Sequence, residues 1–145
     1  MNNMRILGID YGDARVGLAI SDPLGITAQG LETIHHKNND KIVLKRLEEI
    51  INEYEVETIA IGMPINLDGT GSARVEITKK FIHKLKCKFN KVNIVEIDER
   101  LTTVSAHRTM NELDINKNKK RQIVDTISAV YILEIYLQKL KNGVI

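Results

Sequence analysis

The sequence predicts a single α/β domain, residues 1–145, built on a mixed five-stranded sheet. Three observations favour this fold class. β-rich segments alternate with turn residues near the N-terminus, helical and strand-like periodicities alternate in the middle, and one long helical pattern closes the chain. With 43% hydrophobic and 28% charged residues in a chain of 145, the composition is typical of one globular domain.

The first expected elements are three short strands in an antiparallel meander. Residues 4–10 alternate and are β-rich, a turn at 12–13 follows, and residues 16–20 form the second strand. A third strand is expected at residues 29–34. This hairpin excludes a doubly wound nucleotide-binding fold, in which a helix would follow the first strand.

Helices and strands alternate through the rest of the chain. Apolar spacing predicts a helix that begins near Asn39 or Asp40 and extends through residue 51. The remaining expected elements are a strand at 58–62, a helix at 72–85, a strand at 92–97, a helix from Thr102 or Thr103 to 113, and a helix at 119–141. Three antiparallel strands followed by this alternation, with right-handed crossovers, is the order of the ribonuclease H fold.

Carboxylates stand at the ends of two expected strands and at the start of the last helix. Asp10 ends the first strand on a face with apolar neighbours. Asp98 and Glu99 end the last strand, and only one of them can share the face of Asp10. Asp125 heads an apolar row of the final helix. Such acids repel one another unless a cation neutralises them, and oxygen ligands favour Mg²⁺ or Mn²⁺.

Each acid alone also has an ordinary structural explanation. Asp10 could begin a turn, Asp98 could pair with Arg100, and Asp125 could stabilise the helix dipole. A shared metal site explains all three positions at once, so it is the preferred interpretation.

Four blocks of sequence carry a resemblance to a known family. They are Gly8–Gly12 with Arg15–Ala19, Ile61–Thr70, Asp98–Thr103 and Val124–Ala129. Together they resemble the YqgF family, also called RuvX, whose members are described as pre-16S ribosomal RNA nucleases with a Holliday-junction-resolvase-like, ribonuclease H fold. The resemblance spans nearly the whole chain, and it implies metal-binding and catalytic roles for Asp10, the Asp98–Glu99 pair and Asp125.

The resemblance implies a metal-dependent phosphodiester hydrolase that matures the 5′ end of pre-16S ribosomal RNA. Two divalent ions about 4 Å apart would activate water and stabilise the leaving oxygen. In many related nucleases an acid follows the strand that here ends at residues 62–64, so the second ligand must come from the neighbouring strand. The side chains expected to hold nucleic acid are Arg15, Arg100, Lys119, Lys120, Arg121 and Asn66.

Other functions fit parts of the pattern. A Holliday-junction DNA endonuclease and a non-catalytic RNA-binding factor of ribosome assembly remain open, and the protein could act as a homodimer. A sugar-kinase or actin-like phosphotransferase would need two such domains, which 145 residues do not supply. Four tyrosines, two phenylalanines and no tryptophan leave few platforms for base stacking, so binding would depend on backbone charge.

The sequence also indicates where the protein works. The longest apolar stretch is shorter than the ~20 residues of a membrane span, and no signal peptide is recognisable. Together with a lone cysteine, Cys87, this predicts a cytoplasmic protein without a membrane partner. The four histidines share no ligand spacing, so each is expected on the surface or on a helix: His35, His36, His83 and His107.

Overall fold

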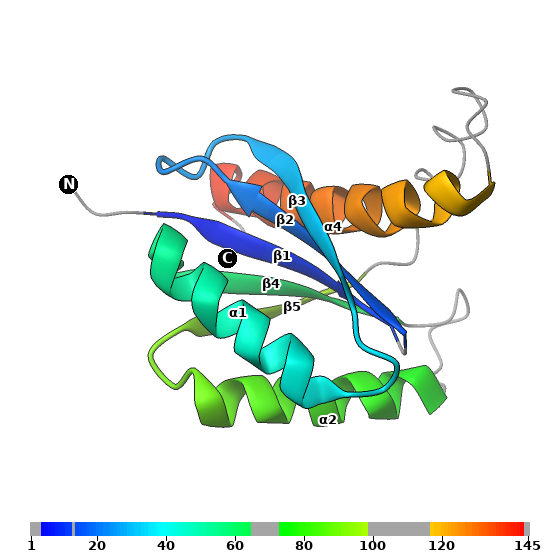
Figure 1. The fold of residues 1–145 in the computed structure, drawn as a ribbon. Coiled ribbons are helices and arrows are strands. Elements are labelled where there is room, and N and C mark those ends of the chain that lie inside the picture. The colour runs from blue at the N-terminus through cyan, green and yellow to red at the C-terminus, as the bar shows by residue number, and fades with distance from the viewer. Residues whose placement is uncertain (1–3, 13, 65–72, 99–116, 144–145) are drawn as a thin grey trace.

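The computed structural model describes residues 4–12, 14–64, 73–98 and 117–143, with side chains of the last segment described from residue 126 (Figure 1). Its elements are β1 (Ile6–Tyr11), β2 (Arg15–Ser21), β3 (Ala28–His35), α1 (Asp40–Tyr54), β4 (Thr58–Met63), α2 (Ala73–Lys88), β5 (Asn93–Asp98) and α4 (Lys117–Lys141). The predicted order of these elements is confirmed. The helix expected between Thr102 or Thr103 and residue 113 lies outside the described residues.

The strands form one five-stranded sheet in the order β3-β2-β1-β4-β5. β1 pairs with β2 and β2 with β3 in antiparallel fashion, whereas β1 with β4 and β4 with β5 are parallel. The predicted mixed sheet is therefore confirmed. Figure 1 shows α1 and α2 on one face of the sheet and α4 on the other.

Each face of the sheet has its own apolar core. Leu7 and Ile9 of β1 pack with α1 and α2, whereas Ile6 of the same strand packs with α4 residues that include Ala129. Every residue of β4 is buried. A parallel strand covered by helices on both sides requires this uninterrupted apolar sequence.

Two glycines let α4 approach the sheet closely. An added Cβ at Gly8 would lie 2.8 Å from the carbonyl oxygen of Ala129 and 2.9 Å from the Cβ of Leu133. At Gly30 it would collide with the methyl group of Thr126. A side chain at Gly8 would thus force backbone apart, while at Gly30 it would meet one methyl group.

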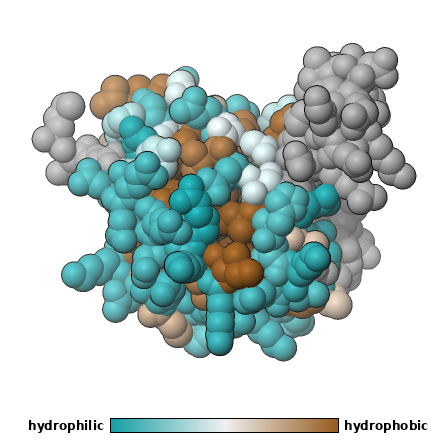
Figure 2. All heavy atoms as spheres, in the orientation of Figure 1, coloured by the Kyte–Doolittle hydropathy of each residue, from teal (hydrophilic) through white to brown (hydrophobic). Residues whose placement is uncertain are grey.

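The surface over α1 and α2 is mainly hydrophilic, as Figure 2 shows. Hydrophobic atoms gather at the end of the molecule where β2 and β3 are connected, and that connection carries Leu24 and Ile26, which are 57% and 66% exposed. Within the described ranges, every helix is too short or too polar to cross a membrane.

Candidate active site

Asp10 lies one residue from the end of β1, in the middle of the sheet, and its side chain is half-buried. Alternation along the strand places it on the same face as Ile6 and Gly8. Ile6 packs in the α4 core and Gly8 faces the backbone of α4, so Asp10 lies on the α4 face of the sheet.

The cross-strand register places the beginning of the described α4 side chains over the same region. Asp10 pairs with Gly17, and Gly17 pairs with Thr33. Thr33 in turn lies against α4, because its Oγ1 is 3.1 Å from Oγ1 of Thr126. The turn of α4 that contains Asp125 therefore lies above the row of residues that begins with Asp10.

The direction of α4 agrees with this placement. Tyr136, near its C-terminal end, contacts Thr58, which pairs with the first residue of β1. Ala129 lies over Gly8 in the middle of β1. The helix thus runs antiparallel to β1, and its Asp125 end lies toward the strand end that carries Asp10. The buried row Ala129, Ile132 and Tyr136 agrees with the sequence pattern.

β5 ends at Asp98, the first member of the Asp98–Glu99 pair. Asp98 pairs with Met63, which belongs to the core under α1 and α2, whereas the preceding residue Ile97 belongs to the α4 core. Asp98 is exposed and lies on the face opposite Asp10. Glu99 lies outside the described residues.

Of the expected nucleic-acid-binding side chains, the structure describes Arg15. It is the first residue of β2, two residues before Gly17, and therefore projects to the α4 face with Asp10. Arg100 and Asn66 lie outside the described residues, and for Lys119, Lys120 and Arg121 only the helical backbone is described. The structure thus places one of the expected acids, Asp10, and one of the expected basic side chains, Arg15, on the same face of the sheet.

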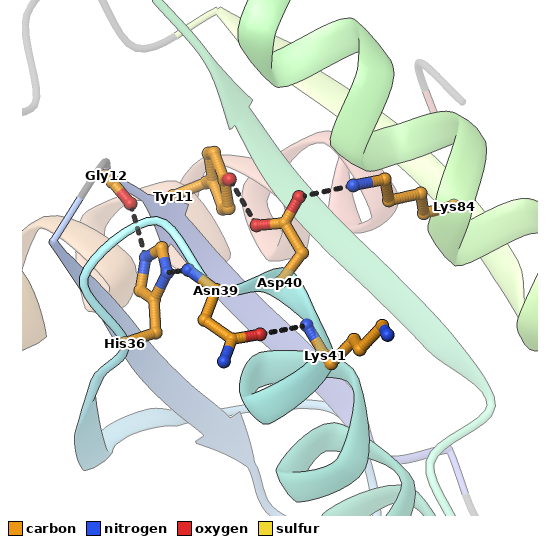
Figure 3. Close-up of polar contacts among 7 residues, drawn as sticks. All are labelled: Tyr11, Gly12, His36, Asn39, Asp40, Lys41 and Lys84. Carbon is orange, nitrogen blue, oxygen red and sulfur yellow. Dashed lines mark hydrogen bonds and ion pairs between the residues drawn. The ribbon is translucent and has the colours of Figure 1, made fainter.

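The strand end at Asp10 is held by a polar network on the opposite face, drawn in Figure 3. The ring of Tyr11 stacks on Phe81 of α2, with centroids 4.1 Å apart, and its hydroxyl donates to Asp40 at 2.6 Å. Lys84 of α2 contacts the other oxygen of the same carboxylate at 2.8 Å. One residue after Asp10, the strand is therefore tied to both α1 and α2.

Asp40 is kept ionised within this network. Its partial burial acts to raise the pKa of the carboxyl group, but hydrogen bonds from Lys84 and Tyr11 and the charge of Lys84 outweigh that effect, and the pKa lies below its usual value. The charged form therefore accepts both hydrogen bonds at neutral pH.

His36 is the residue that the sequence reasoning missed. The expectation of a surface or helix position is wrong for it, because it is only 3% exposed and follows β3. Its Nδ1 accepts from the N–H of Asn39 at 3.1 Å and its Nε2 lies 2.8 Å from the carbonyl oxygen of Gly12 (Figure 3). Nε2 therefore carries the proton and donates a hydrogen bond to the carbonyl oxygen of Gly12, in the turn that follows Asp10. Its backbone N–H donates to Ala14 in the same turn.

Replacing His36 by leucine is expected to destabilise the protein by roughly 1–3 kcal/mol, because it removes the hydrogen bonds of both ring nitrogens, and the carbonyl of Gly12 loses its bond to the ring. The N–H of Asn39 keeps its bond to the backbone carbonyl of His36. Urea unfolding measures the change. The exposed neighbour His35 provides the matched control, since His35→Leu should change stability by less than about 0.5 kcal/mol. Equal effects of the two variants would show that the buried ring does not hold the turn.

Arg74 is a second residue that sequence patterns did not single out. It lies in the first turn of α2, is exposed, and donates from Nη2 to the carbonyl oxygen of Tyr11 at 3.3 Å. No signal in the sequence could reveal this contact, because it depends on where α2 begins relative to the end of β1. It places a guanidinium group next to the residue that follows Asp10.

The lysines of α2 lie on the other side of the sheet from Asp10, because α2 packs in the opposite core. Three of them pair with carboxylates: Lys84 with Asp40, Lys88 with Glu48 and Lys79 with Glu76. This basic stretch of sequence is therefore a solvated, partly neutralised helix face rather than part of the surroundings of Asp10.

The described residues contain no group of three histidine, cysteine or acidic side chains close enough to hold a metal ion. Asp10 is the one expected ligand with a described side chain on the α4 face. In α4, which covers the same face, Ser128 is buried and its hydroxyl has no hydrogen-bond partner among the described residues. A carboxylate and an unpartnered hydroxyl are oxygen groups of the kind that a hard cation and its bound waters engage.

Comparisons with known proteins show the family of the chain. Residues 4–139 match the model of the RuvX family, described as Holliday junction resolvase. A Ruminiclostridium cellulolyticum protein described as a "putative pre-16S rRNA nuclease" is 60% identical over 140 residues, which are 97% of this chain and 98% of the relative. One from Acetivibrio thermocellus with the same description is 54% identical over 134 residues, or 92% and 95% of the two chains.

Solved structures of low identity share the fold. RuvC of T. thermophilus, in complex with Holliday junction substrate, aligns with a TM-score of 0.57 and 13% identity over 94% of this chain and 96% of that chain. The Fowlpox virus resolvase, in complex with Holliday junction DNA, aligns with a TM-score of 0.58 and 13% identity over 94% and 99%. The ribonuclease H-like fold expected from the order of elements is confirmed.

Proposed function

Because the chain belongs to the RuvX family, we propose that it is a metal-dependent nuclease that hydrolyses phosphodiester bonds in precursor small-subunit ribosomal RNA. Family membership supports the nuclease class, and the description shared by relatives up to 60% identical supports the ribosomal substrate. The ribosomal substrate is the more specific part of the proposal, because the family model is described as Holliday junction resolvase and so refers to DNA.

The observation that carries the proposal is the place of Asp10. Asp10 is half-buried at the end of the central strand, on the face covered by α4, and the end of α4 that contains Asp125 lies toward the same end of the sheet. Two acids brought toward one strand end from distant parts of the sequence are the arrangement that a cation would neutralise.

The oxygen donors of this face fit Mg²⁺ or Mn²⁺, which Asp10, Asp125 and one member of the Asp98–Glu99 pair would hold. A divalent ion bound there would polarise water for attack on phosphorus and stabilise the leaving oxygen. The chain's own part is to hold the carboxylates in place and to bind the substrate. Arg15 on the same face can contact a phosphate adjacent to the scissile bond, and its charge would offset that of the backbone.

Within the Asp98–Glu99 pair we assign the ligand role to Glu99, since Asp98 lies on the face opposite Asp10. Glu99→Gln is expected to lower kcat/KM for cleavage by at least ~100-fold, the scale for loss of a group that acts at the reacting centre. Asp98→Asn should lower it by less than about tenfold. Cleavage rates at saturating Mg²⁺ measure both, and the reverse ranking would overturn the assignment.

The substrate test uses two nucleic acids in parallel. We expect purified protein to cut a 5′-extended small-subunit ribosomal RNA fragment in the presence of Mg²⁺ or Mn²⁺ and to cut a four-way DNA junction more slowly. Faster cleavage of the junction would support the nuclease assignment but would identify branched DNA, rather than ribosomal RNA, as the substrate. If neither is cut, while the RNA is still bound, the protein is a binding factor of ribosome assembly and the catalytic proposal fails.

A further inference from the structure

Ser128 is a buried polar residue that the proposed function has not yet used. It lies in α4, is 1% exposed, and its hydroxyl is the one buried side-chain polar atom in the described part of the chain that lacks a hydrogen-bond partner. Buried hydroxyl groups are normally paired, so an unpaired one requires an explanation, and a role in binding is one of the recognised explanations.

Other buried polar side chains of the sheet and its loops are paired. Ser21 accepts from the N–H of Ile6 at 2.8 Å and donates to the carbonyl of Asp22 at 3.0 Å. His36 is bonded through both ring nitrogens. Alanine at position 128 would avoid the cost of an unpaired hydroxyl and favour the helix more strongly. The hydroxyl of Ser128 therefore gives the unliganded fold no advantage over alanine.

The geometry of α4 shows which way Ser128 faces. Thr126 contacts β3, and Ser128, 200° further around the helix, is on the other flank. Ile132 lies one turn after Ser128 in the same row. Gly30 of β3 lies against Thr126 and Gly8 of β1 lies against Ala129, so the flank of α4 that points away from β3 lies toward β1 and β4. Ser128 is thus directed toward the side of β1 and β4, one turn nearer the sheet end that carries Asp10.

We propose that Ser128 is a positioning residue of the proposed cation site, whose hydroxyl gains its hydrogen-bond partner when a divalent ion binds beside Asp10. That partner is an oxygen of the ion's coordination sphere, either a bound water or a ligating carboxylate. The inference rests on the proposed function, because it needs the cation. It predicts two effects that do not depend on cleavage: the hydroxyl of Ser128 lowers the stability of the metal-free protein, and it increases the affinity of the protein for the ion.

The test measures Mn²⁺ binding and thermal unfolding of the metal-free full chain, neither of which requires a substrate. For Ser128→Ala we expect Mn²⁺ to bind about tenfold more weakly, the lower end for loss of a group that orients metal ligands. The melting temperature of the metal-free protein should stay the same or rise by about 2–4 °C. Thr126→Val is the matched control, since it removes the hydroxyl on the other flank and should lower the melting temperature without changing Mn²⁺ affinity.

The outcomes separate this inference from the proposed function. If Ser128→Ala binds Mn²⁺ as the wild type does, or if its metal-free form melts at a lower temperature, Ser128 is not a positioning residue. If Ser128→Ala fails in this way but Asp10→Asn abolishes Mn²⁺ binding, the cation site at Asp10 stands and only the role of Ser128 is wrong. If wild type does not bind Mn²⁺, or if Asp10→Asn binds it equally well, both the cation site and the role of Ser128 are wrong.

Discussion

Asp10→Asn is expected to lower the rate of phosphodiester cleavage by roughly 100- to 1,000-fold or more while the protein remains folded. Asparagine has nearly the same shape, so the packing of the half-buried side chain against the α4 face should persist. What is lost is the negative charge at the centre of the sheet, and with it the ability to hold a hard cation. Cleavage of the ribosomal RNA fragment in Mg²⁺, with circular dichroism for folding, measures both parts.

Asp22→Asn is the control for this experiment. Asp22 lies in the β2–β3 connection, where hydrogen bonds from Thr27 and Ile26 hold the pKa of its carboxyl group below the usual value. Both donors contact the same oxygen, which asparagine retains. Asp10 pairs with Gly17 near the start of β2, whereas Asp22 follows the last residue of that strand. The control therefore removes a carboxylate charge at a distance from Asp10 and should preserve the cleavage rate. An Asp10→Asn enzyme as active as this control would eliminate Asp10 from the reaction.

Gly8→Ala is expected to destabilise the fold by roughly 1–3 kcal/mol, since its Cβ would lie 2.8 Å from the carbonyl oxygen of Ala129. Backbone cannot yield as a flexible side chain can, so α4 must move away from β1. A displacement of about 1 Å between groups on α4 and Asp10 is enough to cost ~100-fold in rate. Urea unfolding and single-turnover cleavage on the same preparation measure the two effects.

Gly30→Ala provides the comparison. Its Cβ would collide with the methyl group of Thr126, so the loss of stability should be relieved by Thr126→Ser, which removes the methyl and keeps the hydroxyl bonded to Thr33. Truncating Leu133 to alanine should not rescue Gly8→Ala, because alanine keeps the Cβ that the new side chain would meet at 2.9 Å, and the clash with the carbonyl oxygen of Ala129 also remains. A full rescue would mean that side-chain packing alone, rather than backbone contact, sets the distance between α4 and β1.

Local sequence patterns predict much of this fold because they report local physics. The apolar run of β4 after Thr58 indicates a strand covered on both sides. Asn39 caps α1 by accepting from the N–H of Lys41 at 3.2 Å, which decides between Asn39 and Asp40 as the start of the helix. The long apolar row of α4 likewise reports burial of Ala129 and Tyr136. In each case one stretch of chain contains the whole signal.

The site depends on contacts between distant segments, which no local pattern records. Alternation says that Asp98 and its neighbour face opposite ways, but only the pairing of Asp98 with Met63 says which face is which. His36 is buried because residues 37 and 38 take positive φ angles of 47° and 63° and turn the chain back against Gly12. A lysine in that conformation is uncommon, so composition gives no warning of it.

The pairing of β1 has a consequence for synthesis on the ribosome. β1 is complete at residue 11 and gains β2 within the next ten residues, but its other edge is covered only by β4, at residues 58–63. Until those residues emerge, the nascent chain presents an open strand edge with Leu7 and Ile9, and α4, which covers Gly8, is translated last. Exposed edges of this kind recruit other strands, so translation pauses before residue 63 should increase aggregation and chaperone dependence.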